Sequence, residues 1–162
     1  MHHTLVVLVE DKPGVLARVA SQFRRRMFNI ESMSASVTAP GITSITFAVD
    51  SDQTSVDRLV GSLSKLVNVL QVEDLADRGV ARGLALVKVA RANGNPAALQ
   101  RIVDDGRGRI VATGDRTITV EITGDSEQID AVVLQLEEFG IVDMARTGLV
   151  VLAGGDDKIS KQ

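Results

Sequence analysis

The fold is decided by a stretch near the N-terminus that reads Leu5-Val-Val-Leu-Val-Glu-Asp-Lys-Pro-Gly-Val-Leu-Ala-Arg-Val19. Its first five residues form an unbroken apolar run rich in β-branched side chains, which is typical of a buried central strand. A proline follows in a short polar segment, and proline is favoured where a helix begins because its missing N–H has no partner there. Apolar residues then recur at spacings of three and four, which predicts an amphipathic helix with one face on a sheet. These residues are Leu16, Val19, Phe23 and Met27.

The segments that follow complete one unit of strands and helices. Apolar and small residues alternate with serines over 30–37, a Pro-Gly turn follows, and the alternation resumes over 45–49. This pattern predicts a hairpin with one polar face. A helix is expected next, because residues 54–57 have the spacing of a capping box. A strand over 67–75 ends the unit, so the order of elements is strand, helix, strand, strand, helix, strand.

The same order recurs in the second half, offset by about 80 residues. It comprises an apolar run at 84–89, a helix after Asn95-Pro96, a hairpin over 109–122, a helix from Asp125-Ser126 and a last strand over 141–152, broken near Gly148. This pattern predicts an α+β fold of two ferredoxin-like βαββαβ units in tandem. We expect a first domain at 1–76, a linker at 77–83, a second domain at 84–154 and a frayed polar tail at 155–162.

Each unit is small, and size bears on how the chain assembles. A domain of about 75 residues is near the lower limit for independent stability. Because the predicted helices cover one face of each sheet, the other face and the sheet edges are available for pairing with another copy. We therefore expect a homodimer.

Composition excludes several classes of function. The net charge is −3, with 18 Lys and Arg against 21 Asp and Glu, and aromatic residues make up 2% of the chain. We therefore expect no nucleic-acid partner, because neither a basic field nor a set of stacking aromatics is present. The chain has no cysteine, and its two histidines are His2 and His3. No apolar run is long enough to span a bilayer, so we expect a cytoplasmic protein without a membrane segment.

The strand-to-helix turn at Asp11 to Leu16 is the best local candidate for a binding site. The backbone N–H groups of Gly14, Val15 and Leu16 lie at the predicted helix start, where unpaired amides and the helix dipole favour an anion. By spacing alone, the same residues are more typical of an ordinary helix start, in which Asp11 caps the helix and Gly14 relieves crowding. Asn29 is the second candidate, since its amide can bind a carboxylate or an ammonium, although asparagine also commonly ends a helix in the left-handed conformation.

Other motifs are better explained without catalysis. The triplet Arg24-Arg25-Arg26 reads as a solvated or partner-docking helix face. Gly106-x-Gly108 lacks the third glycine of a dinucleotide-binding loop and reads as a turn. Glu137 and Glu138 are neighbours in sequence and cannot share one face of a helix. We find no catalytic motif and no set of metal ligands, so the chain is expected to have no active site and no metal of its own.

Three stretches resemble a known family. They are 8–19, Phe28-Asn-Ile-Glu-Ser32 and Lys65-Leu-Val-Asn-Val-Leu70, and 86–89 and 144–152 extend the likeness into the second half. Together they resemble the small regulatory subunit of acetolactate synthase (acetohydroxyacid synthase). The opening unit resembles an ACT domain, a βαββαβ module that senses amino acids.

The resemblance implies a function and a site. It implies a non-catalytic subunit in branched-chain amino-acid biosynthesis that activates a catalytic large subunit and confers feedback inhibition by a branched-chain amino acid, with valine the expected effector. Thiamine diphosphate, FAD and Mg²⁺ would be carried by the catalytic partner and not by this chain. ACT domains of two subunits would pair side by side. Asp11, Gly14, Val15 and Leu16 of one subunit would bind the effector, and Asn29 and Ile30 of the other would close the site.

The chain also departs from the family pattern. Asp11 stands where several members have Asn, Ser44 where Arg is common, Gly83 where Glu is usual, and Asp105-Gly106 at an apolar-aromatic position. These differences bear on the strength of inhibition and on the docking surface. The alternative interpretation is a stand-alone ACT-type amino-acid-binding protein that regulates a different enzyme.

Overall fold

The computed structural model describes residues 1–75 and 78–159. The chain divides into two compact units, one formed by Met1–Val80 together with the residues from Gly148 onward, and the other by Ala81–Thr147. The C-terminal segment therefore belongs to the first unit, although the second unit precedes it in sequence. Among the described residues no helix is long and apolar enough to cross a membrane.

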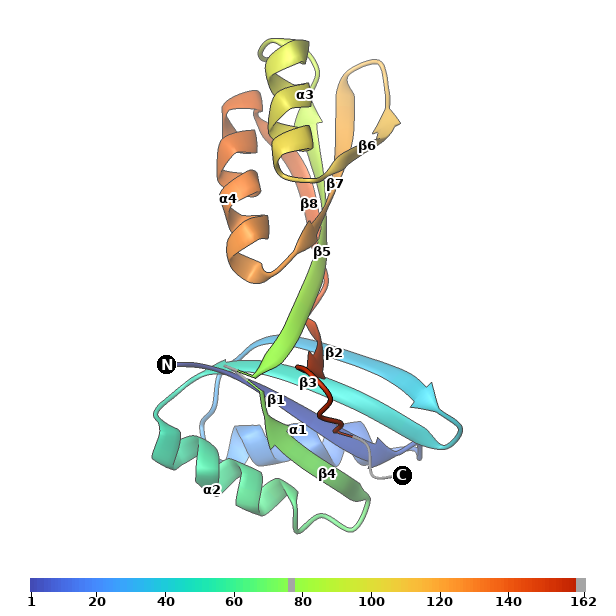
Figure 1. Cartoon of the computed structure of the whole chain (residues 1–162), viewed down its shortest axis with the longest axis vertical. Helices are drawn as coiled ribbons and strands as arrows, with labels where there is room; N and C mark the ends of the chain where they lie inside the picture. The colour runs from blue at the N-terminus through green and yellow to red at the C-terminus, as the bar shows by residue number, and fades with distance from the viewer. Residues whose placement is uncertain (76–77, 160–162) are drawn as a thin grey trace. The chain divides into compact units, whose positions relative to one another are not determined.

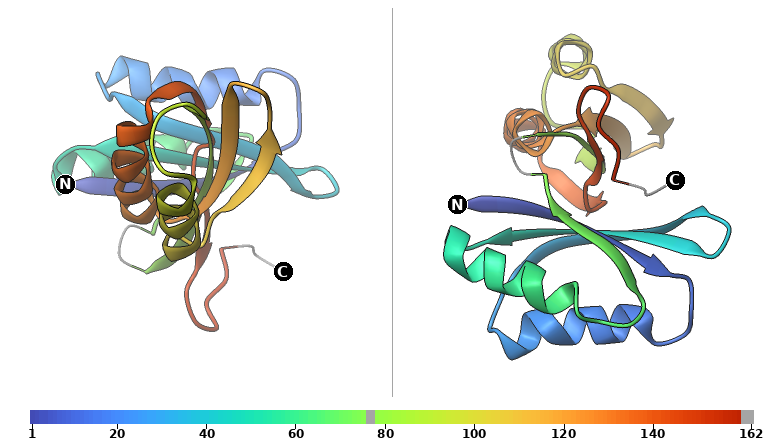
Figure 2. Two further views of the ribbon diagram at one scale, coloured as in Figure 1. Left: turned by 90° about the horizontal axis from the view of Figure 1, so that it is seen from above. Right: turned by 60° about the horizontal axis from the view of Figure 1, so that its bottom comes forward.

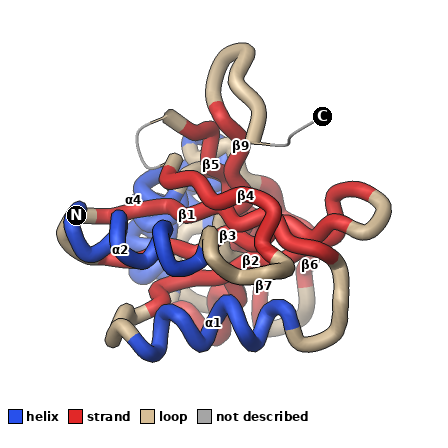
Figure 3. Tube along the Cα trace, turned by 90° about the horizontal axis from the view of Figure 1, so that it is seen from below, coloured by secondary structure: helices blue, strands red, loops and turns tan. Residues whose placement is uncertain are grey.

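The first unit is a four-stranded sheet with two helices on one face (Figures 1 and 3). Its elements are β1 (His2–Glu10), α1 (Val15–Arg25), β2 (Ile30–Ala39), β3 (Ile42–Asp50), α2 (Gln53–Leu63) and β4 (Val69–Asp74). The strands lie in the order β2-β3-β1-β4, and every pair is antiparallel. This is the predicted ferredoxin-like order, with β1 central because the continuous apolar run of the sequence buries it on both faces.

The core of this unit lies between the sheet and its helices. Alternate residues of β1 and β3 meet the apolar faces of α1 and α2 there. The fully buried members include Leu5, Val7, Val19, Phe23, Phe47, Leu59 and Leu63. Ring centroids of Phe23 and Phe47 are 4.3 Å apart, which ties the last turn of α1 to β3.

The opposite face of the same sheet is also covered. Val6 and Leu8 point away from the helices, because they alternate with Leu5 and Val7, yet they are only 1% and 8% exposed. The C-terminal segment of this unit has buried residues of its own, Val151 and Ile159, each 7% exposed. The expectation of a freely available sheet face is therefore wrong for this part of the sheet.

The second unit repeats the arrangement. Its elements are β5 (Gly79–Ala90), α3 (Pro96–Asp105), β6 (Arg109–Thr113), β7 (Thr117–Gly124), α4 (Ser126–Leu136), a 3₁₀ turn η1 (Glu137–Phe139) and β8 (Ile141–Arg146). The strand β9 (Val150–Ala153) follows in sequence and belongs to the first unit. The sheet order is β6-β7-β5-β8, and β9 pairs with β5. Helices α3 and α4 cover one face of this sheet (Figure 2). As predicted, Asn95 caps α3 and α4 starts at Asp125-Ser126, where Asp125 and Gln128 also form a capping box.

Two expected segments, the linker and the tail, differ in the structure, and the predicted break in the last strand is confirmed. The strand β5 begins at Gly79, so 79–83 of the predicted linker is strand, while Asp77 lies outside the described residues. The last strand is broken around Gly148, as predicted, into β8 and β9. The predicted frayed tail contains the buried Ile159, and its final residues 160–162 lie outside the described part of the chain.

Candidate functional site

The turn between β1 and α1 presents an uncapped helix start. Gly14 is the N-cap residue, with a φ of 82° and a ψ of −5°, and no side chain caps the helix. The left-handed conformation explains why glycine stands here, since other residues adopt it only with strain. A Cβ built on Gly14 has no atom within 4 Å, so the space in front of the helix is open. The interpretation in which Asp11 caps the helix is therefore wrong, and Pro13 precedes the helix and does not begin it.

The three amides predicted to bind an anion are not equivalent. The Val15 N–H donates to the carbonyl of Lys12 at 3.3 Å. Within the described parts of the chain, the amides of Gly14 and Leu16 have no hydrogen-bond acceptor. Two of the three donors are therefore free at the positive end of the α1 dipole, which is the arrangement that binds a carboxylate.

The side chains around these amides have separate roles. Val15 is 3% exposed and belongs to the core, so only its backbone faces the turn. Leu16 is 41% exposed and lies at the surface beside the free amides. Asp11 is exposed and accepts a hydrogen bond from the Thr43 hydroxyl at 3.2 Å. The carboxylate is thus tied to β3 and does not cap α1, which leaves the helix end available.

Asn29 and Ile30 lie at the far end of α1. The helix has 11 residues, so its ends are about 16 Å apart at 1.5 Å per residue. The residue in the left-handed conformation there is Met27, with a φ of 60°, and not Asn29. Asn29 is exposed, and Ile30 opens β2 opposite Val49. One chain therefore cannot bring Asn29 to Gly14, and the two halves of the predicted site can meet only between two copies.

The edge strand β2 is suited to such a meeting. It pairs with β3 on one side only, because it is the first strand in the order of the sheet. Met33 and Val37 on this strand are 43% and 61% exposed, and the adjacent Met27 is 90% exposed. Exposed apolar residues next to an unpaired strand edge mark a surface that favours association.

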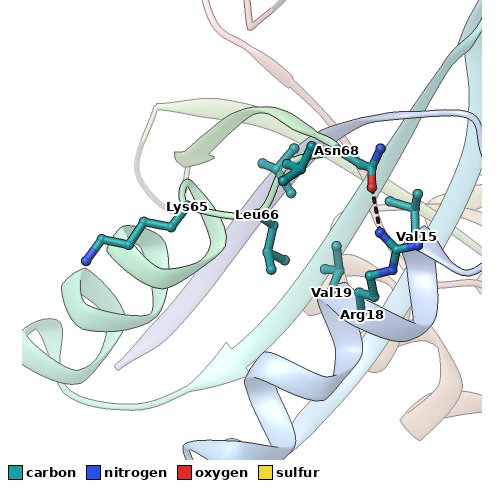
Figure 4. A pocket seen from close by; sticks show the side chains of 8 residues that line it. Val15, Arg18, Val19, Lys65, Leu66 and Asn68 are labelled. Atoms are coloured by element: carbon teal, nitrogen blue, oxygen red, sulfur yellow. Dashed lines mark hydrogen bonds between the residues drawn. The ribbon is translucent and has the colours of Figure 1, made fainter.

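A hollow beside α1 was not predicted from the sequence. It has a volume of about 230 Å³ and lies between α1 and the segment that connects α2 to β4 (Figure 4). The walls are mostly valine and leucine, and Arg18, Lys65 and Asn68 supply the polar groups. Val15 is the one predicted site residue that lines it. No spacing in the sequence links Arg18 to residues 65–69, because the contact arises only when β4 pairs with β1.

A chain of polar contacts closes the rim of this hollow. The Arg18 guanidinium donates to Asn68 Oδ1 at 2.8 Å, and the Asn68 amide donates to Glu10 Oε2 at 2.8 Å. Lys12 Nζ lies 2.7 Å from the same Glu10 oxygen. Hydrogen bonds from Lys12 and Asn68 hold the pKa of the Glu10 carboxyl below its ordinary value. These groups satisfy one another, so the rim holds the helix start in place and offers few free polar groups to a ligand.

Within the described part of the chain, one group of residues could hold a metal ion, and it consists of His2, Glu31 and Asp50. Their donor atoms lie within 4.8 Å of one another, and all three residues are exposed. Asp50 already accepts a hydrogen bond from the N-terminal amine of Met1 at 2.6 Å, and this bond holds the pKa of Asp50 below its ordinary value. The cluster is therefore explained as surface ion pairing.

Gly106 and Gly108 in the second unit lie in a turn, as predicted. Arg107 has a φ of 53°, and a Cβ on Gly108 would lie 2.8 Å from the Glu121 carbonyl oxygen. A Cβ on Gly106 would lie 2.5 Å from Val132 Cγ2. Close packing of the backbone therefore requires both glycines.

Comparisons with known proteins match both halves of the chain. A family model described as the AHAS small subunit-like ACT domain matches residues 5–71, and one described as the small subunit of acetolactate synthase matches residues 82–155. A probable acetolactate synthase small subunit of Archaeoglobus fulgidus is 36% identical over 98% of this chain and 100% of the relative. An acetolactate synthase small subunit of Mycobacterium leprae is 41% identical over 94% of this chain and 92% of the relative.

A solved structure agrees with these sequence matches. The crystal structure of the acetolactate synthase small subunit from Thermotoga maritima superimposes with a TM-score of 0.86 at 29% identity. The alignment covers 97% of this chain and 99% of that chain. The likeness therefore extends over both units and the C-terminal segment.

Proposed function

The chain belongs to the acetolactate synthase small-subunit family, and we propose that it regulates the catalytic subunit of that enzyme. In this role it binds the catalytic large subunit, raises its activity and transmits feedback inhibition by a branched-chain amino acid, valine. The chain carries no active site in this proposal. Thiamine diphosphate, FAD and Mg²⁺ are assigned to the catalytic partner.

The observation that carries the sensing role is the uncapped start of α1. The free amides of Gly14 and Leu16 suit the carboxylate of an amino acid. The Asp11 carboxylate, three residues before Gly14 in sequence, suits the ammonium group of the same amino acid. The exposed side chain of Leu16 supplies an apolar surface for a branched aliphatic side chain.

The second half of the site is proposed to come from a partner copy. Side-by-side pairing through β2 would place Asn29 and Ile30 of one subunit across from the α1 start of the other. The unpaired edge of β2 and the exposed Met33 and Val37 support this pairing. Asn29 is exposed, and its side chain has no hydrogen-bond partner among residues 1–75 and 78–159, which fits a role across an interface.

The interactions are of the size that a metabolite sensor needs. A carboxylate at a helix start contributes about 1 kcal/mol, and burial of a valine side chain contributes about 1.5–3 kcal/mol. Two or three hydrogen bonds add about 1 kcal/mol each. Because ordering and association oppose this gain, affinity is expected between about millimolar and micromolar.

Reconstitution tests the activating role. The full chain is added to the separately purified catalytic subunit, and turnover is measured as a function of added chain. We expect turnover to rise and then saturate. No rise at saturating chain would contradict the proposal, and capture of a different enzyme on the immobilised chain would favour the alternative of an ACT-type regulator with another target.

Calorimetry tests the sensing role. Valine, leucine and isoleucine are titrated separately into the full chain, and the oligomeric state is measured by light scattering in the same buffer. We expect a dimer that binds valine, with one of the other two amino acids binding more weakly. A folded dimer that binds none of the three would remove the sensing role.

A further inference from the structure

Gly148 rests directly on the backbone of β2. A Cβ built on it would lie 2.5 Å from the carbonyl oxygen of Met33, 2.6 Å from the carbonyl carbon of Met33 and 3.0 Å from the amide nitrogen of Ser34. All three atoms belong to the main chain, so no side-chain rotation can make room. Only glycine allows the chain to pass β2 this closely.

The segment that begins at Gly148 is fastened further along. The Gly154 amide donates to the Arg78 carbonyl at 2.7 Å. A Cβ on Gly79 would lie 2.6 Å from Val151 Cγ1, and Val151 itself is buried. Ile159 is also buried. The segment 148–159 is thus held at several points within the first unit, and Gly148 has little freedom to move independently of β2.

The residue before Gly148 is held by the second unit. The Thr147 amide donates to the Leu84 carbonyl at 2.9 Å, and the Leu84 amide donates to Thr147 Oγ1 at 2.9 Å. Thr147 and Gly148 are therefore consecutive residues, of which the first is tied to β5 and the second to β2. One peptide bond therefore separates the residue that contacts β2 from the residue that is hydrogen-bonded to β5.

We propose that the Thr147–Gly148 junction couples the effector site to the second unit. This proposal rests on the proposed function, in which Asn29 and Ile30 at the start of β2 close the site on the effector. Ligand binding shifts the position or mobility of the β2 edge, and the close contact at Gly148 transmits the shift to Thr147 and β5. Such coupling requires one element that both ends bias, and we assign this role to β2 because of its close contact with Gly148.

Hydrogen exchange on the unaltered full chain tests the coupling. Exchange of the amides is followed with and without saturating valine. We expect at least a threefold change in rate at residues 14–16 and 29–34, and also at Leu84 and Thr147, while α3 stays unchanged. A change confined to 14–16 and 29–34 would overturn the coupling. The absence of any change in the chain would instead show that the proposed sensing function fails.

A substitution at Gly148 tests whether its contact with β2 is needed for inhibition by valine. Gly148→Ala is compared with Gly114→Ala, where a new Cβ would have no atom closer than 3.6 Å. We measure valine affinity by calorimetry, together with activation and inhibition of the reconstituted enzyme. For Gly148→Ala we expect affinity within threefold and activation within twofold of the unaltered chain, but at least a tenfold higher valine concentration for half-inhibition. Gly114→Ala is expected to match the unaltered chain.

Two outcomes would overturn the coupling. The first is half-inhibition of the Gly148→Ala enzyme at the same valine concentration as the unaltered enzyme. The second is an equal loss of valine binding and of inhibition, since Gly148 would then only support the shape of the binding site.

Thr147→Val provides a second variant in case Gly148→Ala does not fold, because Thr147 is exposed and the change removes only the acceptor for Leu84. It is expected to raise the half-inhibition concentration at unchanged affinity, and normal inhibition would again overturn the proposal.

Discussion

The carbonyl of Gly14 accepts the first hydrogen bond of α1, from the Arg18 amide at 3.1 Å, while Gly14 itself keeps a left-handed backbone with a φ of 82°. Gly14 thus starts the helix without supplying any side chain to cap it. The dipole of α1 is left exposed at an open turn. Position 14 therefore meets two conditions: its backbone adopts a positive φ, and no side chain fills the space in front of the helix. Substitutions that share the same backbone strain but differ in charge can test the second condition alone.

Charge at position 14 is expected to abolish effector binding. Gly14→Asp and Gly14→Asn place side chains of nearly equal size at the same positive φ, which both residues tolerate better than most. Only aspartate adds a negative charge where the carboxylate of the amino acid is proposed to bind. We expect the Asn variant to bind valine within about tenfold of the unaltered chain and the Asp variant to show no binding by calorimetry.

Thermal unfolding is the control for this pair. Because the conformational strain is shared, the two variants should unfold within a few degrees of each other and somewhat below the unaltered chain. Equal valine affinity in the Asp and Asn variants would place the effector elsewhere.

Asn29 is expected to matter for binding and not for folding. Its side chain is exposed and has no hydrogen-bond partner among the described residues, so Asn29→Ala should change the free energy of unfolding by less than about 0.5 kcal/mol. Loss of a partner buried by the ligand and the second copy should weaken valine binding by about 1–3 kcal/mol. Urea unfolding and calorimetry on the same preparation measure both. Unchanged affinity would exclude Asn29 from the site.

Most of the fold could be predicted because its signals are local. The apolar run of β1, the period of α1 and the Asn95-Pro96 and Asp125-Ser126 helix starts each depend on neighbouring residues. The repeated order of elements then left few topologies to consider. Free amides at the start of α1 were predictable in part, since glycine after a buried strand is visible in the sequence, whereas the hydrogen bond from the Val15 amide to the Lys12 carbonyl was not. Anion binding at this turn stays a prediction.

What could not be predicted depends on contacts between distant residues. Thr43 accounts for the position of Asp11, and no pattern links the two in sequence. The predicted capping box at 54–57 is wrong because Asp52, one residue before α2, accepts the Ser55 amide instead. The glycine at position 148 predicted a break in the last strand. Its contact with Met33 could not be predicted, because it depends on the C-terminal segment belonging to the first unit.

A charge on the β2 edge is expected to separate the proposed dimer. Val37 is 61% exposed on β2, so Val37→Glu adds a carboxylate to the proposed interface without disturbing the core. Burying this charge against a second copy is unfavourable, and we expect the dissociation constant of the dimer to rise at least tenfold. Light scattering at micromolar concentration measures the change. Val67→Glu is the matched control, because Val67 is 93% exposed and lies outside β2. Equal masses for both variants would contradict pairing through this edge.

Acid is expected to weaken the start of α2 through Asp52. The hydroxyl and amide of Ser55 donate to its carboxylate at 2.7 and 2.9 Å, and these bonds hold the pKa of Asp52 below its ordinary value. A carboxyl with a lowered pKa in the folded state adds stability above its unfolded value, near pH 4, and loses it as the pH falls further. Urea midpoints of the unaltered chain and of Asp52→Asn should therefore differ at pH 6, and the difference should shrink as the pH falls below about 4. Asp156→Asn, which changes an exposed carboxylate outside any helix or strand, should show no such convergence. A difference for Asp52→Asn that stays constant from pH 6 to pH 3 would show that the charge of Asp52 does not stabilise α2.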